Sequence, residues 1–257
     1  MKFNFVDKRV LVTGASRGLG QVCANEFARR GARVVLSGRD SKRLEEVRMA
    51  LPSLDKHMIF AGDLQFPEVI EKLVDASKAF LGGLDIVVHV AGGGLGFRDP
   101  LLNWEQLNTL HKVNLGIAAE INRLVFPDMV KNKRGFAIHI CSRASQEAIA
   151  SVGYNTVKTA LASYVRSLGR EFADTGVVIT GVLAGVFYAP ENSWERLRQT
   201  KPEVVERYIE ENLPRKYIPD AKELIPLILF LSSEAASMMS GSCVPIDAGE
   251  SKAYTFE

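Results

Sequence analysis

The sequence predicts a doubly wound α/β fold, in which a single seven-stranded parallel sheet carries helices on both faces. Short apolar runs alternate with amphipathic stretches along nearly all of the 257 residues, a pattern typical of repeated strand–helix units. A glycine-rich turn at residues 13–20 directly follows the first apolar run and opens the first amphipathic stretch. Because seven candidate strands suggest a single doubly wound sheet, we expect one domain over residues 1–257.

Seven apolar runs are the candidate strands, at residues 9–12, 33–36, 57–60, 85–88, 136–141, 177–182 and 243–246. Six stretches between them have helical signals, at residues 18–30, 41–50, 67–80, 104–132, 153–173 and 221–231. The fifth is the clearest, because apolar residues recur every three or four positions along one stripe: Val157, Leu161, Tyr164, Val165, Leu168 and Phe172. The apolar side of that helix must therefore be buried.

Residues 187–219 interrupt this alternation between the sixth strand and the last helix. The segment is charged, rich in Glu and Arg, and contains four prolines, Pro190, Pro202, Pro214 and Pro219. A long excursion from a compact sheet domain is more typical of a functional loop than of a second domain. We expect residues 187–219 to form a substrate-binding lid inserted in the domain.

The charge balance gives no reason to expect a nucleic acid as partner, since 32 basic and 30 acidic residues leave a net charge of +2. Cys23, Cys141 and Cys243 are too far apart to suggest a disulfide framework or a zinc site. The four histidines also lack ligand-type spacing, so we expect no metal. No run of about twenty apolar residues could span a bilayer, and the amino terminus has no cleavage-site pattern. We expect a cytoplasmic protein that binds no membrane.

The glycine-rich turn predicts a site for a dinucleotide. A turn that follows a strand and opens a helix lets backbone amides approach phosphate oxygens, and the helix dipole favours their negative charge. Gly14, Gly18 and Gly20 occupy that context in the first strand–helix unit. The alternative interpretation is a tight strand–helix turn without a ligand.

Tyr154 and Lys158 lie four residues apart, and Ser142 lies twelve positions upstream of Tyr154. Side chains four apart share one face of a helix, so the phenol and the ammonium can address one small volume. A phenol exchanges protons poorly at neutral pH unless a neighbouring cation stabilises the phenolate, and Lys158 supplies that cation. The alternative is an amphipathic helix with a tyrosine at its margin and an exposed lysine.

These motifs together resemble the short-chain dehydrogenase/reductase family. The turn has the spacing G-x-x-x-G-x-G, and further matches follow along the whole chain: Asp63-Leu64, Ala91-Gly92, Asn114, Ser142, Tyr154-x-x-x-Lys158, Gly185 and Asp247-Ala248-Gly249. The resemblance implies a Rossmann fold and an oxidoreductase that interconverts a secondary alcohol and a ketone by hydride transfer. It also implies a homotetramer in which the helices at 104–132 and 153–173 pair between subunits, with a second interface at the sixth strand and the carboxyl terminus.

The resemblance assigns a role to each matching residue. Tyr154 is the acid/base, Ser142 orients the substrate oxygen, Lys158 binds the nicotinamide ribose, and Asn114 anchors a water relay to the lysine. The expected cofactor-binding residues are Gly14, Ser16, Arg17, Gly18, Leu19, Gly20, Arg39, Asp63, Leu64, Ala91, Gly92, Asn114, Tyr154, Lys158, Gly185 and Val186. For Asp63 the expected role is a hydrogen bond to the adenine amino group; the alternative is an N-terminal cap for the helix near Pro67.

The residues after the second strand favour NADP(H) over NAD(H). The chain reads Ser37-Gly38-Arg39-Asp40, so no carboxylate stands at the strand end to accept both ribose hydroxyls. Guanidinium groups at Arg39 and Arg17 could clamp a 2′-phosphate. Asp40 is one residue late for the ribose role, and Arg39 as a solvated strand-end charge is the alternative.

The chain departs from the family pattern in two places, at residues 89–92, where His89-Val90 replaces a pair of asparagines, and at residues 183–189. His89 stands where asparagine is usual, so the polar bracing of the fourth strand must be made differently. Ala184 stands where proline is usual, and Ala189 stands where a threonine often contacts the nicotinamide carboxamide. These changes leave the cofactor contacts beyond Gly185 open.

The expected lid is polar and cationic, with Tyr188, Glu191, Asn192, Ser193, Trp194, Arg196, Arg198 and Arg207. Such residues suit a hydroxylated or anionic substrate, such as a sugar or nucleotide-sugar, although exposed helix faces explain the composition about as well. The lid is also similar to those of bacterial surface-polysaccharide pathway members of the family. The alternatives are a 3-oxoacyl-carrier-protein reductase and, in another class, a catalytically silent NADP(H)-binding regulator.

Overall fold

The computed structural model describes residues 3–253, and within them it has a single seven-stranded parallel sheet with the order β3-β2-β1-β4-β5-β6-β7. The strands are β1 (Arg9–Thr13), β2 (Arg33–Gly38), β3 (His57–Ala61), β4 (Ile86–His89), β5 (Gly135–Ile140), β6 (Val177–Ala184) and β7 (Cys243–Ile246). The predicted doubly wound fold is therefore confirmed. The direction in which successive strands are added to the sheet reverses between β1 and β4. In open α/β sheets, ligands bind at such a switch point.

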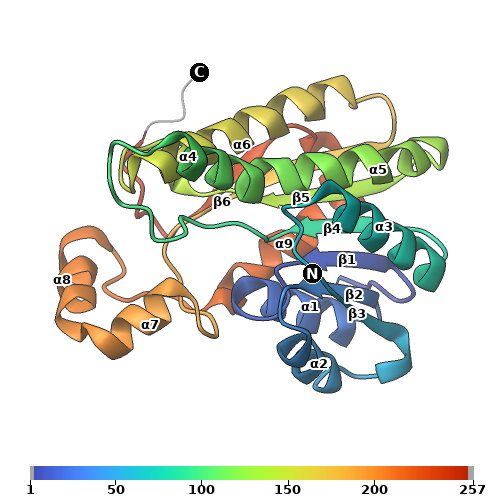
Figure 1. Cartoon of the computed structure of the whole chain (residues 1–257), viewed down its shortest axis with the longest axis horizontal. Helices are drawn as coiled ribbons and strands as arrows, with labels where there is room; N and C mark the ends of the chain where they lie inside the picture. The colour runs from blue at the N-terminus through green and yellow to red at the C-terminus, as the bar shows by residue number, and fades with distance from the viewer. Residues whose placement is uncertain (1–2, 254–257) are drawn as a thin grey trace.

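Helices cover both faces of the sheet (Figure 1). One face is covered by α1 (Gly18–Arg29), α2 (Ser41–Met49) and α9 (Ile225–Leu231), whose apolar residues join one buried cluster. The other is covered by α3 (Pro67–Leu81), α5 (Ile117–Lys131) and α6 (Val152–Glu171), which contribute to a second cluster. Every residue of β4 and β6 is buried, because helices lie on both sides of these central strands.

The single helix predicted at 104–132 is interrupted. It consists of α4 (Trp104–His111), a π-helical turn at Lys112–Gly116, and α5. Inside the turn, the side chain of Asn114 donates to the carbonyl oxygen of Leu110 at 2.9 Å and competes with the regular backbone ladder. The prediction of one continuous helix was wrong here because a side chain with a role in the site inserts into it.

Most other boundaries differ from the prediction by one or two residues, and two differences bear on the description of the site and the last helix. β5 ends at Ile140, so Cys141 lies just outside the strand, in the turn towards Ser142. The helix expected at 221–231 is a 3₁₀ turn, Ala221–Glu223, followed by α9. Cys23, Cys141 and Cys243 are free thiols.

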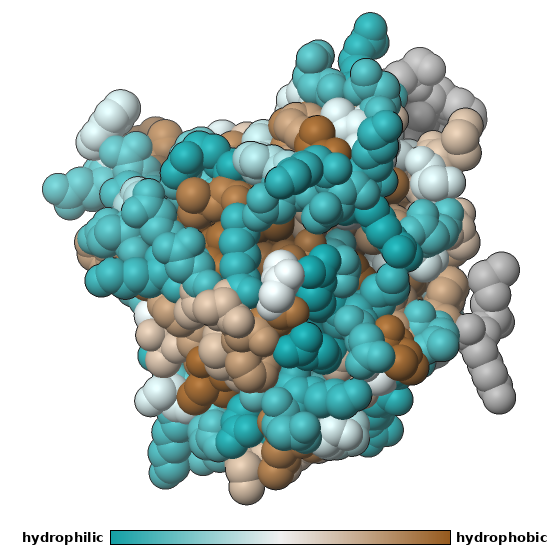
Figure 2. Space-filling model, turned by 90° about the vertical axis from the view of Figure 1, so that its right-hand side faces the viewer, coloured by the Kyte–Doolittle hydropathy of each residue, from teal (hydrophilic) through white to brown (hydrophobic). Residues whose placement is uncertain are grey.

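The segment 187–219 contains α7 (Ser193–Thr200) and α8 (Pro202–Asn212), which lie to one side of the sheet in Figure 1. It has a small apolar cluster of its own, built on Val205, Leu213 and Ile218. No helix among residues 3–253 is long and apolar enough to cross a membrane. The face shown in Figure 2 is mostly hydrophilic, with hydrophobic residues gathered to the left of its centre.

Candidate active site

The predicted site residues gather at one edge of the sheet. Gly14 directly follows β1, Ala91 lies two residues beyond β4, Ser142 two residues beyond β5, and Gly185 directly follows β6. Since the strands are parallel, their carboxyl ends meet at the same edge. The structure therefore brings these four segments together at the edge where open α/β sheets bind their ligands, and we call this region the crevice.

The glycine turn lies tightly against the end of β4. A Cβ on Gly14, whose φ is 66°, would lie 3.1 Å from the amide nitrogen of Ala91, and one on Gly20 would lie only 2.2 Å from the carbonyl oxygen of Gly14. Within the described chain, the Leu19 and Gly20 amides at the start of α1 have no hydrogen-bond acceptor, whereas Gly18 donates to the carbonyl of Pro190 at 2.8 Å. Free amides at a helix N-terminus suit an anion.

Thr13, which the sequence analysis did not single out, braces the loop after β4. Its hydroxyl oxygen accepts hydrogen bonds from the amides of Val90, at 3.0 Å, and Ala91, at 3.1 Å. A buried threonine as the last residue of an apolar strand was the signal for this role. The loop after β4, which an asparagine would be expected to hold in the family, is thus held here by Thr13 at the end of the neighbouring strand β1.

His89 lies inside the molecule and belongs to a buried polar network. Its Nε2 lies 2.9 Å from Oδ1 of Asn122, whose Nδ2 lies 3.1 Å from Nε2 of His139. The two imidazole rings stack with centroids 4.5 Å apart. Burial lowers the pKa of His89 to about 4. Burial also lowers the pKa of His139, and the neighbouring His89 lowers it further. Both rings are therefore neutral at pH 7 and serve the fold.

Asn114 is 2% exposed and is anchored to the loop after β4. Its Oδ1 accepts the amide of Gly93 at 2.9 Å, and its Nδ2 donates to the carbonyl oxygen of Gly93 at 3.0 Å. A Cβ on Gly92 would lie 2.7 Å from this Oδ1 and 3.6 Å from Nζ of Lys158. Asn114, the loop after β4 and the lysine therefore meet at one point.

Tyr154 and Lys158 stand one turn apart on α6, as the spacing predicts. The ammonium of Lys158, a residue 4% exposed, donates to the carbonyl oxygen of Ile140 at 2.8 Å and lies 5.7 Å from the centre of the Tyr154 ring. A Cβ on Gly94 would lie 3.7 Å from that ring. The tyrosine is half-buried at the mouth of the crevice, while the lysine is held below it at the end of β5.

Ser142 begins a segment that we call the serine loop, residues 142–147. Its Oγ accepts the amide of Ala144 at 3.1 Å, and no hydrogen bond joins it to Tyr154 in the described part of the chain. The loop is tied to α6 by Asn155, which donates to the carbonyl oxygen of Ala144 at 2.8 Å, and by Thr159, which donates to that of Ser145 at 3.1 Å. Ser142 is thus fixed against the helix that carries Tyr154 and Lys158.

At the other end of the crevice, Arg17 and Arg39 are exposed and form no ion pair with any residue between 3 and 253. Ser16 lies beside the end of β2, since a Cβ on Gly38 would be 3.2 Å from its hydroxyl oxygen. The carboxylate of Asp63 accepts the amide of Gln65 at 3.1 Å. Because the cap of α3 is Phe66 without a side-chain bond, the alternative role of Asp63 as a cap is wrong.

The turn after β6 is packed against the carboxyl-terminal segment. A Cβ on Gly185 would lie 2.5 Å from a carboxylate oxygen of Glu250, and the amide of Val186 donates to that oxygen at 2.8 Å. Ala189 is buried, and so is Leu64 after β3. Three side chains of this region escaped the sequence analysis, Arg143, Tyr208 and Glu250, because their interactions span 42 to 107 residues of chain.

Several polar residues of the expected lid are used inside it. Asn192 caps α7 by accepting the amide of Glu195 at 2.8 Å. The guanidinium of Arg198 lies 4.5 Å from the centre of the Tyr188 ring and donates to Glu195 at 2.7 Å. Trp194 packs on Tyr208 with ring centroids 4.6 Å apart. Much of the polar composition therefore serves the fold of the segment.

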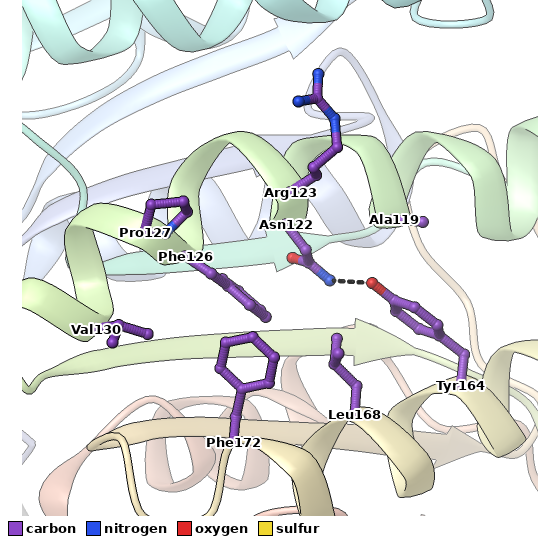
Figure 3. A pocket seen from close by; sticks show the side chains of 9 residues that line it. All are labelled: Ala119, Asn122, Arg123, Phe126, Pro127, Val130, Tyr164, Leu168 and Phe172. Atoms are coloured by element: carbon purple, nitrogen blue, oxygen red, sulfur yellow. Dashed lines mark hydrogen bonds between the residues drawn. The ribbon is translucent and has the colours of Figure 1, made fainter.

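A groove of about 470 Å³ lies away from the crevice, between α5 and α6. Figure 3 shows Phe126 on α5 facing Phe172 on α6, with the hydrogen bond between Asn122 and Tyr164 at one side. Pro127, Val130 and Leu168 also line the groove. None of the predicted catalytic residues lines it. It is a mainly apolar face of the helix pair.

Comparisons with known proteins agree with this geometry. A family model described as short chain dehydrogenase matches residues 8–200. A glucose 1-dehydrogenase of Gluconobacter oxydans is 30% identical over 253 residues, which cover 96% of this chain and 93% of that protein.

Solved structures of 26% identity are similar over nearly their whole length. The L-sorbose reductase of Gluconobacter frateurii, complexed with NADPH and L-sorbose, superposes with a TM-score of 0.89 and covers 99% of this chain and 100% of that one. The 3-oxoacyl (acyl-carrier-protein) reductase of Agrobacterium tumefaciens, with NADP bound, has a TM-score of 0.88 and covers 96% and 95%. With the matched family model, the fold and the site residues in place, the chain belongs to the short-chain dehydrogenase family.

Proposed function

We propose that the protein is an NADP(H)-dependent oxidoreductase that interconverts a secondary alcohol and a ketone, with Tyr154 as the acid/base. The observation that carries this proposal is the position of Lys158, whose ammonium is buried, bonded to the end of β5, and one helical turn from Tyr154. Burying a cation is costly unless it is used or paired. A silent NADP(H)-binding regulator would gain nothing from this arrangement.

The crevice fits a dinucleotide. The glycine turn leaves no room for a Cβ at Gly20 and offers the free amides of Leu19 and Gly20 to a pyrophosphate. Arg17 and Arg39 would hold a 2′-phosphate, since both are exposed and unpaired among the described residues. The NADP(H)-bound structures of two similar proteins support this choice. Asp63, Gly92 and Val186 remain proposed contacts.

When bound, the nicotinamide supplies or accepts the hydride. In reduction, Tyr154 gives its hydroxyl proton to the substrate oxygen, and in oxidation it takes that proton back. Lys158 stabilises the phenolate that remains, and the Ser142 hydroxyl donates a hydrogen bond to the same oxygen. Asn114 holds the loop after β4 in place beside Lys158, where it would anchor a water that passes protons to the lysine.

For the substrate we propose a sugar or a related polyol, bound under the lid at 187–219. The glucose 1-dehydrogenase and the L-sorbose reductase among the similar proteins support this class. An uncharged sugar fits better than a nucleotide-sugar, because Arg198 is engaged with Tyr188 and Glu195 and Arg196 donates to the carbonyl of Glu191. The second candidate is a 3-oxoacyl-carrier-protein reductase, favoured by the similar structure from Agrobacterium tumefaciens.

We also propose that the protein is a homotetramer whose helices α5 and α6 pair between subunits over the apolar groove of Figure 3. The carboxyl-terminal part of the expected second interface, residues 254–257, lies outside the described residues. Light scattering tests this proposal, and a monomer would contradict it.

The oxidoreductase proposal is tested by following NADPH absorbance with three substrate sets: ketoses such as L-sorbose, simple ketones, and acetoacetyl thioesters. The reverse reaction uses NADP with glucose and other polyols. We expect turnover with a ketose or polyol, and turnover confined to the thioesters would favour the carrier-protein reductase. NADPH binding without turnover of any substrate would favour the silent regulator.

A further inference from the structure

Two buried charged side chains meet at the serine loop, Arg143 within it and Glu250 against it, and the reaction described above gives neither of them a role. Arg143 follows Ser142, and its side chain is 8% exposed; Glu250 comes from the carboxyl-terminal segment, and its side chain is 1% exposed. Charged side chains are almost never buried so completely without a partner. Burying these two charges costs free energy, which indicates that they have a role that apolar side chains could not fill.

The carboxylate of Glu250 is shared among three segments of the chain. Its Oε1 lies 3.2 Å from Nη2 of Arg143 and also accepts the hydroxyl of Tyr208. Its Oε2 accepts the amide of Val186 at 2.8 Å. Arg143 completes the unit by donating to the Tyr208 oxygen at 3.1 Å and to the Glu250 carbonyl at 3.0 Å.

Each of these partners belongs to a different wall of the crevice. Arg143 is part of the serine loop, Val186 is part of the turn after β6, and Tyr208 lies on α8 of the expected lid. Trp194 on α7 packs against Tyr208, so both lid helices are tied to the same point. One carboxylate therefore fixes the lid to the catalytic serine side and to the cofactor side.

The charge of Arg143 is satisfied within the protein. Besides Glu250, the guanidinium has Glu147 at 3.7 Å, and Glu147 in turn accepts the amide of Lys252 at 3.2 Å. Arg143 is therefore not free to bind a substrate anion. Burial, together with the hydrogen bond to Glu250, raises the pKa of Tyr208 to about 12, so its phenol stays a hydrogen-bond donor.

We propose that Glu250, with Arg143 and Tyr208, is a positioning unit that sets the lid over the substrate and thereby determines substrate affinity. The inference rests on the proposed function. It assigns Tyr208 to the lid alone, because Tyr208 is a residue of α8 and makes no bond to the turn after β6. It assigns Glu250 both to the lid and to that turn, because its carboxylate bonds to Tyr208 and to the amide of Val186. The two residues therefore have different expected kinetic signatures.

The first test is Tyr208→Phe in the full chain, made in a Trp104→Phe background. The chain has two tryptophans, so Trp194 is then the only one and reports on the lid; Trp104 is 78% exposed and dispensable for packing. The change removes two hydrogen bonds to charged partners, one that the hydroxyl donates to Glu250 and one that it accepts from Arg143. We expect KM for the best ketose or polyol of the panel to rise about tenfold, with kcat and the Kd of NADPH unchanged within about twofold.

Two measurements need no substrate. Trypsin should cleave the segment 198–216 at least about fivefold faster in Tyr208→Phe, and the Trp194 emission should shift, while the melting temperature stays nearly constant. The second variant, Glu250→Gln, should raise both KM and the Kd of NADPH, because it also disturbs Val186. The matched control is Glu234→Gln, which breaks an exposed 2.8 Å pair with Arg134 at the opposite edge of the sheet and should change none of these quantities.

Unchanged KM, proteolysis and Trp194 emission in Tyr208→Phe would overturn the inference. A fall in melting temperature with kcat, KM and NADPH binding impaired alike would also overturn it, because that pattern indicates a structural role only. If no panel substrate is turned over, the proposed function fails, but proteolysis and Trp194 emission still decide whether Tyr208 and Glu250 hold the lid.

Discussion

The buried histidine His89 should make the stability of the fold depend on pH in a defined direction. The residue is 4% exposed, its Nδ1 has no hydrogen-bond partner among the described residues, and its ring stacks on His139. A protonated imidazole would be desolvated there, and burial lowers the pKa of His89 from 6.5 to about 4.

The direction of the pH dependence follows from the protonation of His89 in the unfolded and the folded chain. Below pH 6.5 the unfolded chain takes up a proton at His89, whereas the folded chain does so only near pH 4. The free energy of unfolding is therefore highest above pH 6.5 and falls as the pH decreases towards 4. Over the full range this histidine removes roughly 3 kcal/mol of stability, and between pH 7 and pH 5 it removes roughly 2 kcal/mol.

The assay is urea unfolding at pH 7 and pH 5, at fixed protein concentration, for the wild type, His89→Asn and the control His111→Asn. His111 is exposed on α4. Carboxylates contribute to acid destabilisation in all three proteins, so the quantity of interest is the difference between variants. We expect the loss between the two pH values to be about 2 kcal/mol smaller in His89→Asn than in the wild type and in His111→Asn. An equal loss in all three would refute the assignment of a neutral buried imidazole.

Three further predictions concern the site. Arg39→Asp should lower the ratio of catalytic efficiency with NADPH to that with NADH at least about tenfold, and a wild-type preference for NADH would contradict the cofactor assignment. Gly20→Ala should raise the Kd of NADPH about tenfold or more, because its Cβ would meet the carbonyl of Gly14 at 2.2 Å; Gly116→Ala, whose nearest atom is 3.8 Å away, should leave NADPH binding unchanged in the same titration. Asn114→Ala removes the acceptor of the half-buried Gly93 amide and the donor to the Gly93 and Leu110 carbonyls. Urea unfolding should therefore show a loss of about 1–3 kcal/mol together with reduced kcat, and an unchanged midpoint would count against its anchoring role.

The parts of the fold that depend on local pattern could be predicted from the sequence. The strands and most helices follow from apolar runs and helical periodicity, and the parallel order then brings Gly14, Ala91, Ser142 and Gly185 to one edge. The pair Tyr154 and Lys158 is confirmed as neighbours on α6, because helical spacing is itself local.

What could not be predicted depends on side chains that meet from distant parts of the chain. In the π-helical turn, the side chain of Asn114 bonds both to Leu110 within the helix and to Gly93 in the loop after β4, and no periodicity in 104–132 indicates that distant partner. Arg143 and Glu250 are 107 residues apart in sequence and would each be expected at the surface from composition alone.

Tyr154→Phe is the most direct test of the account, because it removes only the hydroxyl that exchanges the proton. With the substrate found in the panel, we expect kcat to fall by roughly three orders of magnitude or more, while the Kd of NADPH, measured by fluorescence titration, stays within about twofold of the wild type. A variant that retains more than a few per cent of wild-type turnover would contradict the assignment of Tyr154 as the acid/base.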